Sequence, residues 1–249
     1  MLSRKYAKTA CAAALAALSL GAQAQVSGGS VKIGVLTDLS GTYSDLAGSG
    51  AVLATRMAID DLIANEKPNF KIDVVTADHQ NKADIASNKA REWIERENVD
   101  TVTELVTTST ALAVMKVAKE KDRLVIMNGP ASTPITNEQC NDVSVHYTYD
   151  TYAVANGTAK AVTTQGGKSW FFLTADYAFG HALEKDSSTV VLANGGKVVG
   201  SVRHPFPGSA FSSFLLTAQA SGAQVIGLAN AGADATNAIK QAAEFGITP

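Results

Sequence analysis

The feature that most constrains this chain is a regular alternation of short apolar runs with longer amphipathic stretches. The runs that read as β-strands lie at residues 31–36, 70–77, 101–106, 123–128, 169–174, 197–202 and 224–229. Helical stretches separate them, and the first of these carries apolar residues at a helical period, at Ala51, Ala54, Met57, Ala58 and Leu62. Apolar strands that alternate with helices are typical of parallel sheets covered on both faces. The pattern therefore predicts an α/β fold built from βαβ units.

The alternation breaks between residues 129 and 152, where the sequence is polar and has no long helical period. After the break, WFFLTADYAFGHALEKD at 170–186 repeats the plan of IGVLTDLSGTYSDLAGS at 33–49, with a strand, Leu-Thr, an Asp, a loop and a helix. This repeat predicts two α/β lobes of like topology, an N-terminal lobe over 25–142 and a C-terminal lobe over 143–249. The second lobe has fewer predicted strands than the first, so we expect it to be incomplete.

The first 24 residues have the pattern of a secretory signal peptide. A segment with three cations, MLSRKYAK, is followed by the apolar stretch TACAAALAALSL and by the triplet Ala22-Gln23-Ala24, which predicts cleavage after Ala24. The apolar stretch is shorter than the roughly 20 residues that a membrane-spanning helix needs. We therefore expect the mature chain to be soluble and exported.

Charge and cysteine content argue against several classes of protein. The formal net charge is −2, and loss of the three cations of the signal peptide makes it −5, with no block of like charge. This disfavours nucleic acid as a partner. Only Cys140 remains after cleavage, so no internal disulfide is possible. Because the histidines show no metal-ligand spacing with one another or with Cys140, we expect no metal site and no cofactor.

Candidate ligand-binding residues lie just after the predicted strands, because ligands of open parallel sheets bind beyond the carboxyl ends of the strands. The candidates are hydroxyl, aromatic and amide side chains with one proline: Ser40, Thr42, Tyr43, Thr107, Thr108, Pro130, Ser132, Tyr177, Phe179 and Asn230. Hydroxyls and the N–H groups of helix N-termini hold a carboxylate without a fixed cation. An acidic side chain across the cleft would suit an ammonium group. The set therefore fits a small zwitterion or a small organic acid.

These residues also have purely structural interpretations. The threonines are compatible with ordinary strand ends, and the aromatic residues with side chains that pack a loop against the sheet.

A dinucleotide-binding loop is disfavoured, because Gly48-Ser49-Gly50 lies well past the first strand and position 53 is Leu. The G-x-S-x-G and H-E-x-x-H motifs are absent. A catalytic triad assembled from distant residues, with Ser40 or His79 in it, stays open as an alternative.

Several sequence blocks together are characteristic of one family. They are IGVLTDLSGTYSD, TADHQNKAD, DTVTELVTTSTALAV, VHYTYDTYAVANG and WFFLTADYAFGHALEKD. Over residues 31–249 the chain resembles the periplasmic solute-binding proteins of ABC importers, of the leucine/isoleucine/valine-binding type. The resemblance implies a two-lobed type I periplasmic receptor that is not an enzyme and that captures a small amino acid or organic acid for a membrane permease. Full-length members of the family continue further, complete the second lobe and supply an acid that grips the ligand's ammonium group.

The resemblance also implies roles for single residues. Thr107, and Pro130 with Ser132, would hold the carboxylate and amino groups of the ligand. Residues 40–43 would form the edge of the pocket, and Phe179 with nearby Tyr177 would contact the ligand from the second lobe, with a further contact near Asn230. Two alternatives to an importer receptor stay open: a periplasmic hydrolase on a similar fold, and a ligand-sensing module without transport.

Overall fold

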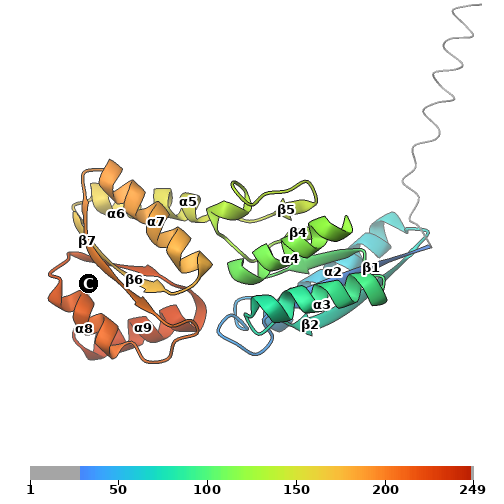
Figure 1. Cartoon of the computed structure of the whole chain (residues 1–249), viewed down its shortest axis with the longest axis horizontal. Helices are drawn as coiled ribbons and strands as arrows, with labels where there is room; N and C mark the ends of the chain where they lie inside the picture. The colour runs from blue at the N-terminus through green and yellow to red at the C-terminus, as the bar shows by residue number, and fades with distance from the viewer. Residues whose placement is uncertain (1–28, 248–249) are drawn as a thin grey trace, which may run out of the picture.

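The computed structural model describes residues 29–247 and contains two separate parallel β-sheets, each flanked by helices (Figure 1). The sheets belong to two lobes that lie side by side, and the chain passes from the first lobe to the second near α5 (Thr151–Val154). The predicted signal peptide, residues 1–24, lies outside the described residues. Within residues 29–247, none of the helices combines the length and the apolar character needed to span a membrane.

The first sheet has the strand order β2-β1-β3-β4-β5, and all its strands run parallel. The strands are β1 (Ser30–Thr37), β2 (Lys71–Asp78), β3 (Thr101–Glu104), β4 (Leu124–Met127) and β5 (Ser144–His146). The four predicted strands of this lobe are confirmed. β5 is not among the predicted strands, because only its central residue, Val145, is apolar. Since β5 pairs with β4, the first sheet extends to His146, and the predicted lobe boundary after residue 142 falls too early by this one strand.

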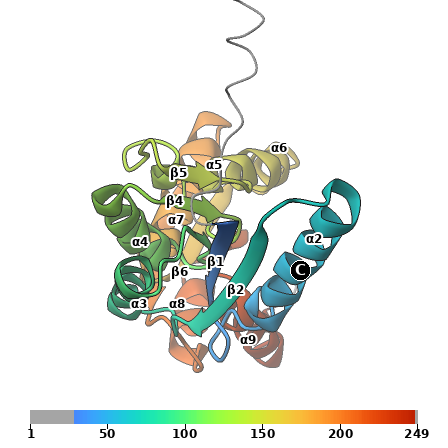
Figure 2. The same cartoon turned by 90° about the vertical axis from the view of Figure 1, so that its right-hand side faces the viewer.

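Helices cover both faces of the first sheet (Figure 2). α3 (Ala83–Arg96) and α4 (Thr108–Lys121) pack against each other on one face, and α2 (Gly48–Glu66) lies on the opposite side. The core of the lobe is on the side of α3 and α4, where Trp93 and Met115 pack with the strand residues Val102 and Val125. Full burial of a large apolar side chain contributes roughly 1.5–3 kcal/mol. This face therefore supplies most of the stability of the lobe.

α2 is a helix, as predicted, but it buries a different face. In the predicted apolar stripe, Met57 is 57% exposed and Leu62 is 41% exposed. The half-buried positions after Gly48 are Ala51, Val52, Thr55 and Ile59, and of these only Ala51 belongs to the predicted stripe. The predicted buried face is therefore wrong. The reason is that α2 carries apolar residues on several faces, so their period does not select one of them.

The second sheet has the strand order β7-β6-β8, which repeats the order β2-β1-β3 of the first sheet and confirms the predicted repeat of topology. Its strands are β6 (Ser169–Ala175), β7 (Lys197–His204) and β8 (Val225–Ala229). α7 (Ala178–Ala193) packs on the side of Trp170 and Phe172, and α8 (Ser212–Ala220) and α9 (Gly232–Glu244) cover the side of Leu173. The chain reaches this sheet through α5, a π-helical turn η3 (Ala155–Ala159) and α6 (Lys160–Thr164).

The two lobes touch at the ends of several elements. The amide of Ala233 at the start of α9 donates to the carbonyl oxygen of Thr42, in the loop after β1, at 3.2 Å. Asp186 of α7 accepts hydrogen bonds from the hydroxyls of Thr133 and Thr151, at 2.8 and 2.6 Å; Thr133 begins the short helix η2 (Thr133–Ile135). Segments that follow the carboxyl ends of strands in both sheets therefore meet at one boundary, which is where parallel sheets place ligands.

Candidate functional site in the cleft between the lobes

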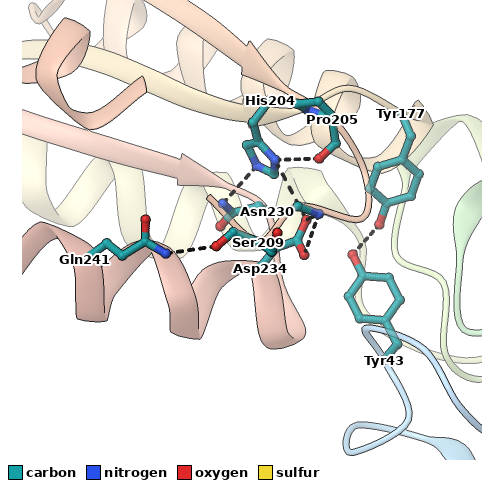
Figure 3. A network of polar contacts seen from close by, with 9 residues as sticks. Tyr43, Tyr177, His204, Pro205, Ser209, Asn230, Asp234 and Gln241 are labelled. Atoms are coloured by element: carbon teal, nitrogen blue, oxygen red, sulfur yellow. Dashed lines mark hydrogen bonds and ion pairs between the residues drawn. The ribbon is translucent and has the colours of Figure 1, made fainter. Parts of the chain in front are cut away.

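Two tyrosines join the lobes at this boundary (Figure 3). Tyr43 comes from the loop after β1 and Tyr177 from the loop after β6, and their hydroxyl oxygens lie 2.5 Å apart. Tyr43 is only 2% exposed. Burial raises the pKa of both phenols well above the usual value, so both stay protonated at neutral pH. The contact is therefore a neutral hydrogen bond between one side chain of each lobe.

An aromatic cluster surrounds this hydrogen bond. The ring of Phe206, in the loop after β7, stacks on Tyr177 with centroids 4.0 Å apart and an interplanar angle of 15°. It also lies 5.4 Å from the ring of Tyr43, and Phe179 lies 6.1 Å from the ring of Tyr177. Phe206 is not among the predicted site residues, although it follows a predicted strand as the others do. The cluster places large apolar surfaces from both lobes at their boundary.

The loop after β1 is held in place by a buried aspartate beneath it. Asp38 is fully buried, and its carboxylate accepts hydrogen bonds from the amides of Gly41 and Tyr43, at 2.7 and 2.8 Å, and from the side-chain amide of Asn81 at 2.5 Å. Several hydrogen bonds to one carboxylate fix the backbone that donates them. This arrangement orients the Tyr43 side chain toward the second lobe.

Two of the other residues predicted in this loop, Ser40 and Thr42, line neither of the two cavities described below. Ser40 is exposed, and its hydroxyl donates to Asp78 at 2.6 Å. Thr42 contributes its carbonyl oxygen to the contact with Ala233. His79 is fully buried, its Nδ1 accepts the amide of Asn81 at 3.0 Å, and burial lowers its pKa to about 4. Ser40 thus bonds to Asp78 and not to His79 in this structure.

The hydroxyls predicted after β3 and β4 bond to one another. Thr107 pairs with Thr110 at 2.7 Å, and Thr108 pairs with Ser132 at 2.7 Å. All four side chains are at most 1% exposed. Pro130, also buried, accepts a hydrogen bond from Nε2 of His146 at its carbonyl oxygen, at 2.7 Å. These contacts join the loop after β3 to the loop after β4, and none of the predicted residues here lines the cavities described below.

Asn230 belongs to a polar network that also contains His204, Pro205 and Asp234 (Figure 3). Its side-chain amide donates to Nε2 of His204 at 3.2 Å, and Nδ1 of His204 donates to the carbonyl of Pro205 at 2.9 Å. Asp234 accepts the amide of Gly208 at 3.1 Å, and burial raises the pKa of its carboxyl. The network holds His204 and Gly208, which stand on either side of Phe206 in the chain. Asn230 therefore helps to position the segment that carries Phe206.

Two adjoining cavities open beside the cluster. A small one, about 60 Å³, lies between the lobes and is lined by Tyr43, Leu46, Val106, Gly129, Ala131, Tyr149, Tyr177, Phe179 and Ala231. A larger one, about 710 Å³, shares Leu46, Val106, Gly129 and Tyr149 with it and extends along the first lobe. Of the predicted residues, Tyr43, Tyr177 and Phe179 line the small cavity. Leu46 and Tyr149 escaped prediction, because Leu46 lies several residues past its strand and Tyr149 follows the unpredicted β5.

The larger cavity has an acidic lining. Glu104 and Asp45 are its charged residues, and its other polar side chains are Ser44, Ser49, Asn128, Thr148 and Tyr149. Glu104 is only 4% exposed, and burial raises the pKa of its carboxyl to about 7. Within the part of the chain that the structure describes, no cluster of three or more His, Cys, Asp or Glu residues is arranged to hold a metal ion. The cleft thus combines aromatic walls with a carboxyl group and hydroxyls, which suits a small organic solute.

Comparison with known proteins agrees with the two-lobed α/β fold. A family model described as periplasmic binding protein matches residues 30–249. The crystal structure of a periplasmic binding protein from Burkholderia mallei superposes with a TM-score of 0.85 at 57% sequence identity and covers 88% of this chain. A branched chain amino acid ABC transporter periplasmic ligand-binding protein from Burkholderia xenovorans has a TM-score of 0.69 at 38% identity over 87% of this chain. A search of curated proteins finds no match.

A more distant structure shares the fold. The solute-binding protein of an ABC transporter from R. palustris, solved in complex with 4-hydroxybenzoate, has a TM-score of 0.77 at 24% identity over 88% of this chain. The chain spans 58% of the length of each Burkholderia protein and 59% of the R. palustris protein. Because the family model matches from residue 30 to residue 249 and the B. mallei protein is 57% identical, the chain belongs to the periplasmic binding protein family.

Proposed function

We propose that this protein is the substrate-binding component of an ABC transporter, a receptor and not an enzyme. It captures a small amino acid or organic acid in the cleft between its lobes and delivers the solute to a membrane permease. The observation that carries the proposal is the hydrogen bond between Tyr43 and Tyr177, which joins the two lobes beside the cavities of the cleft. A contact of this kind forms when the lobes approach and is lost when they separate.

The mechanism that fits this architecture is closure of two rigid lobes about the segments that connect them. Each lobe has its own sheet and its own core, so each can move as a unit. A ligand that touches both lobes stabilises the closed arrangement by its higher affinity for that arrangement. The permease would then recognise the closed form. The family of the chain and the predicted signal peptide support a location in the periplasm.

The walls of the cleft support two classes of solute. Tyr43, Tyr149, Tyr177 and Phe179 offer aromatic surfaces that suit a branched aliphatic side chain or an aromatic ring. The B. xenovorans relative is named for branched-chain amino acids, and the fold of the R. palustris protein accommodates 4-hydroxybenzoate. We place the direct contacts at Tyr43, Tyr177 and Phe179. Thr107, and Pro130 with Ser132, are next to the cavity residues Val106, Gly129 and Ala131 in the chain, and they stay the proposed group for the ligand's carboxylate and amino groups.

A thermal-shift screen of amino acids and aromatic acids on the purified protein tests the proposal. A ligand present at about 100 times its Kd stabilises the folded state by roughly 2.7 kcal/mol, which is a clear shift of the melting temperature. Phe179→Ala, which opens the wall of the small cavity, should abolish the shift. Tyr147→Ala serves as a control, because Tyr147 is 78% exposed and lines neither cavity. A screen without any stabilising solute, or a shift that Phe179→Ala leaves intact, would contradict the proposal.

A further inference from the structure

A buried glutamate stands at the end of a central strand of the first sheet. Glu104 is the last residue of β3, which lies between β1 and β4, and it is 4% exposed. Its φ is +85° and that of Leu105 is +58°, so two successive residues other than glycine adopt the left-handed region. Backbone strain of this kind persists only where the surrounding structure enforces it, and it is concentrated at functional sites. The strain accompanies the placement of Glu104 at the cleft.

The neighbouring strand leaves room for the Glu104 carboxyl. A Cβ atom added to Gly129, just after β4, would lie 2.7 Å from Oε1 of Glu104 and 2.6 Å from Cα of Val106. Any side chain at position 129 would therefore collide with the carboxyl group or with the backbone. The backbone amide of Glu104 donates to the side chain of Asn128 at 3.0 Å, which fixes the residue from the same side. Glu104 is thus held in one position beside the larger cavity.

The Glu104 carboxyl has no partner within residues 29–247. None of the hydrogen bonds or ion pairs between the described residues reaches its two oxygens, and burial is the one cause of its raised pKa. Asp38 is different, because its equally buried carboxylate accepts three hydrogen bonds that hold a loop. The Glu104 oxygens are not among the fully enclosed polar atoms that lack a partner in the described residues, so they open onto accessible space. The partner of Glu104 is therefore to be sought in the space that it faces.

That space is the larger cavity of the cleft, about 710 Å³ in volume. Its lining includes Asn128 beside Glu104 and contains Asp45 but no Lys, Arg or His. The cavity therefore supplies no cation to neutralise Glu104. A group that enters it and contacts Glu104 forms a favourable contact when it carries a hydrogen-bond donor.

We infer that Glu104 is a specificity residue that accepts a hydrogen bond from an N–H or O–H donor of the bound solute, an inference that rests on the proposed function. The ammonium group of an amino acid and the phenolic hydroxyl of a hydroxylated aromatic acid share this chemistry. A solute that lacks the donor leaves the buried carboxyl unpaired, and loss of such a pairing discriminates strongly between otherwise similar ligands. Glu104 thereby selects among solutes that the aromatic walls accept equally.

Two ligand pairs that differ in one donor test the inference. Titration calorimetry on the purified protein would measure the Kd of leucine against 4-methylpentanoate, and of 4-hydroxybenzoate against benzoate. The first pair isolates an ammonium group and the second a phenolic hydroxyl. We expect the wild-type protein to prefer the donor-bearing member of at least one pair by roughly tenfold or more, the usual effect of a hydrogen bond to a charged group. Glu104→Gln should remove most of that preference by weakening the donor-bearing member alone.

Asp45→Asn is the matched control, because it removes the same charge from an exposed position of the same cavity, and it should leave the preference intact. Wild-type protein that binds both members of each pair equally would overturn the inference and leave the proposed function standing. The inference would also be overturned, with the proposed function left standing, if Glu104→Gln weakened the binding of both ligands of a pair to the same extent. Equal weakening would indicate a purely structural role for Glu104. Wild-type protein that binds none of the four solutes would overturn the inference together with the proposed choice of solutes.

Discussion

The hydroxyl groups of Tyr43 and Tyr177 lie 2.5 Å apart although 134 residues separate them in the chain. Tyr43 belongs to the loop after β1, which lies between β2 and β3, and Tyr177 belongs to the loop after β6, which lies between β7 and β8. The repeat of strand order thus places equivalent loops of the two lobes face to face. The Tyr43–Tyr177 contact thus joins residues that the repeat of topology makes equivalent.

Tyr177→Phe should weaken the contact between the lobes. The substitution keeps the ring that stacks on Phe206 but leaves the buried hydroxyl of Tyr43 without its partner, which costs about 1–3 kcal/mol. Urea unfolding would measure the loss. The double variant Tyr43→Phe/Tyr177→Phe should lose less than the sum of the two single variants, because it leaves no unpaired hydroxyl. If the loss of unfolding free energy in the double variant equalled the sum of the two single losses, the two hydroxyls would not interact.

Gly232→Ala should hold the lobes apart. Gly232 has a φ of +59°, and an added Cβ would lie 2.6 Å from both the carbonyl oxygen of Thr42 and the ring of Tyr43. Gly222→Ala is a matched control, because Gly222 has a φ of +65° and nothing within 4 Å of the added Cβ. In both variants, alanine in the left-handed backbone conformation costs about 1 kcal/mol of strain. We expect Gly232→Ala alone to lose further stability and ligand affinity, and equal losses in the two variants would contradict this.

All strands of the described residues except β5 could be predicted, because each of them is an apolar run, and the repeat of LTAD after LTD located the second lobe. The predicted hydroxyls illustrate where sequence alone is insufficient. A buried hydroxyl needs a hydrogen-bond partner. The partner of Thr108 is Ser132, which is 24 residues away in the loop after β4. No local pattern pairs these two residues, so the sequence places both near the cleft without showing that they bond to each other.

Phe206 and Glu104 escaped prediction for different reasons. Phe206 lies between two prolines in a loop that reads as a turn, and only the fold brings its ring onto Tyr177. Glu104 lies inside a predicted strand, where a lone acidic residue reads as a solvent-facing position. Its burial depends on the glycine at position 129 of the neighbouring strand's loop. Both residues thus owe their place to packing between segments that are distant in the chain.

His79 should make the protein less stable in mild acid. Burial lowers the pKa of His79 to about 4 in the folded state, whereas an unfolded histidine has a pKa near 6.5. The unfolded state therefore binds more protons between these values, and stability falls as the pH falls from about 6.5 toward 4, by up to roughly 3 kcal/mol. His79→Gln should flatten this part of the pH profile of the free energy of unfolding. The same substitution at the more exposed His181 is the control, and a slope unchanged in His79→Gln would refute the assignment.

Titration of Glu104 should change the free energy of unfolding with pH in the opposite direction from titration of His79. The two effects can therefore be separated. Burial raises the pKa of the Glu104 carboxyl from 4.5 to about 7 in the folded state. The folded state then binds more protons between these values, and the stability present below pH 4.5 is lost as the pH rises through 7, by up to roughly 3 kcal/mol.

Glu104→Gln removes this titration. We therefore expect the variant to match the wild type near pH 4.5 and to exceed its stability at pH 8, in chemical unfolding without ligand. Asp45→Asn should not reproduce the gain, because Asp45 is exposed. A Glu104→Gln variant less stable than the wild type at pH 8 would mean that the carboxylate is paired within the protein. Without such a pair, the gain at pH 8 measures the stability that the protein gives up to keep an unpaired acid in its cleft.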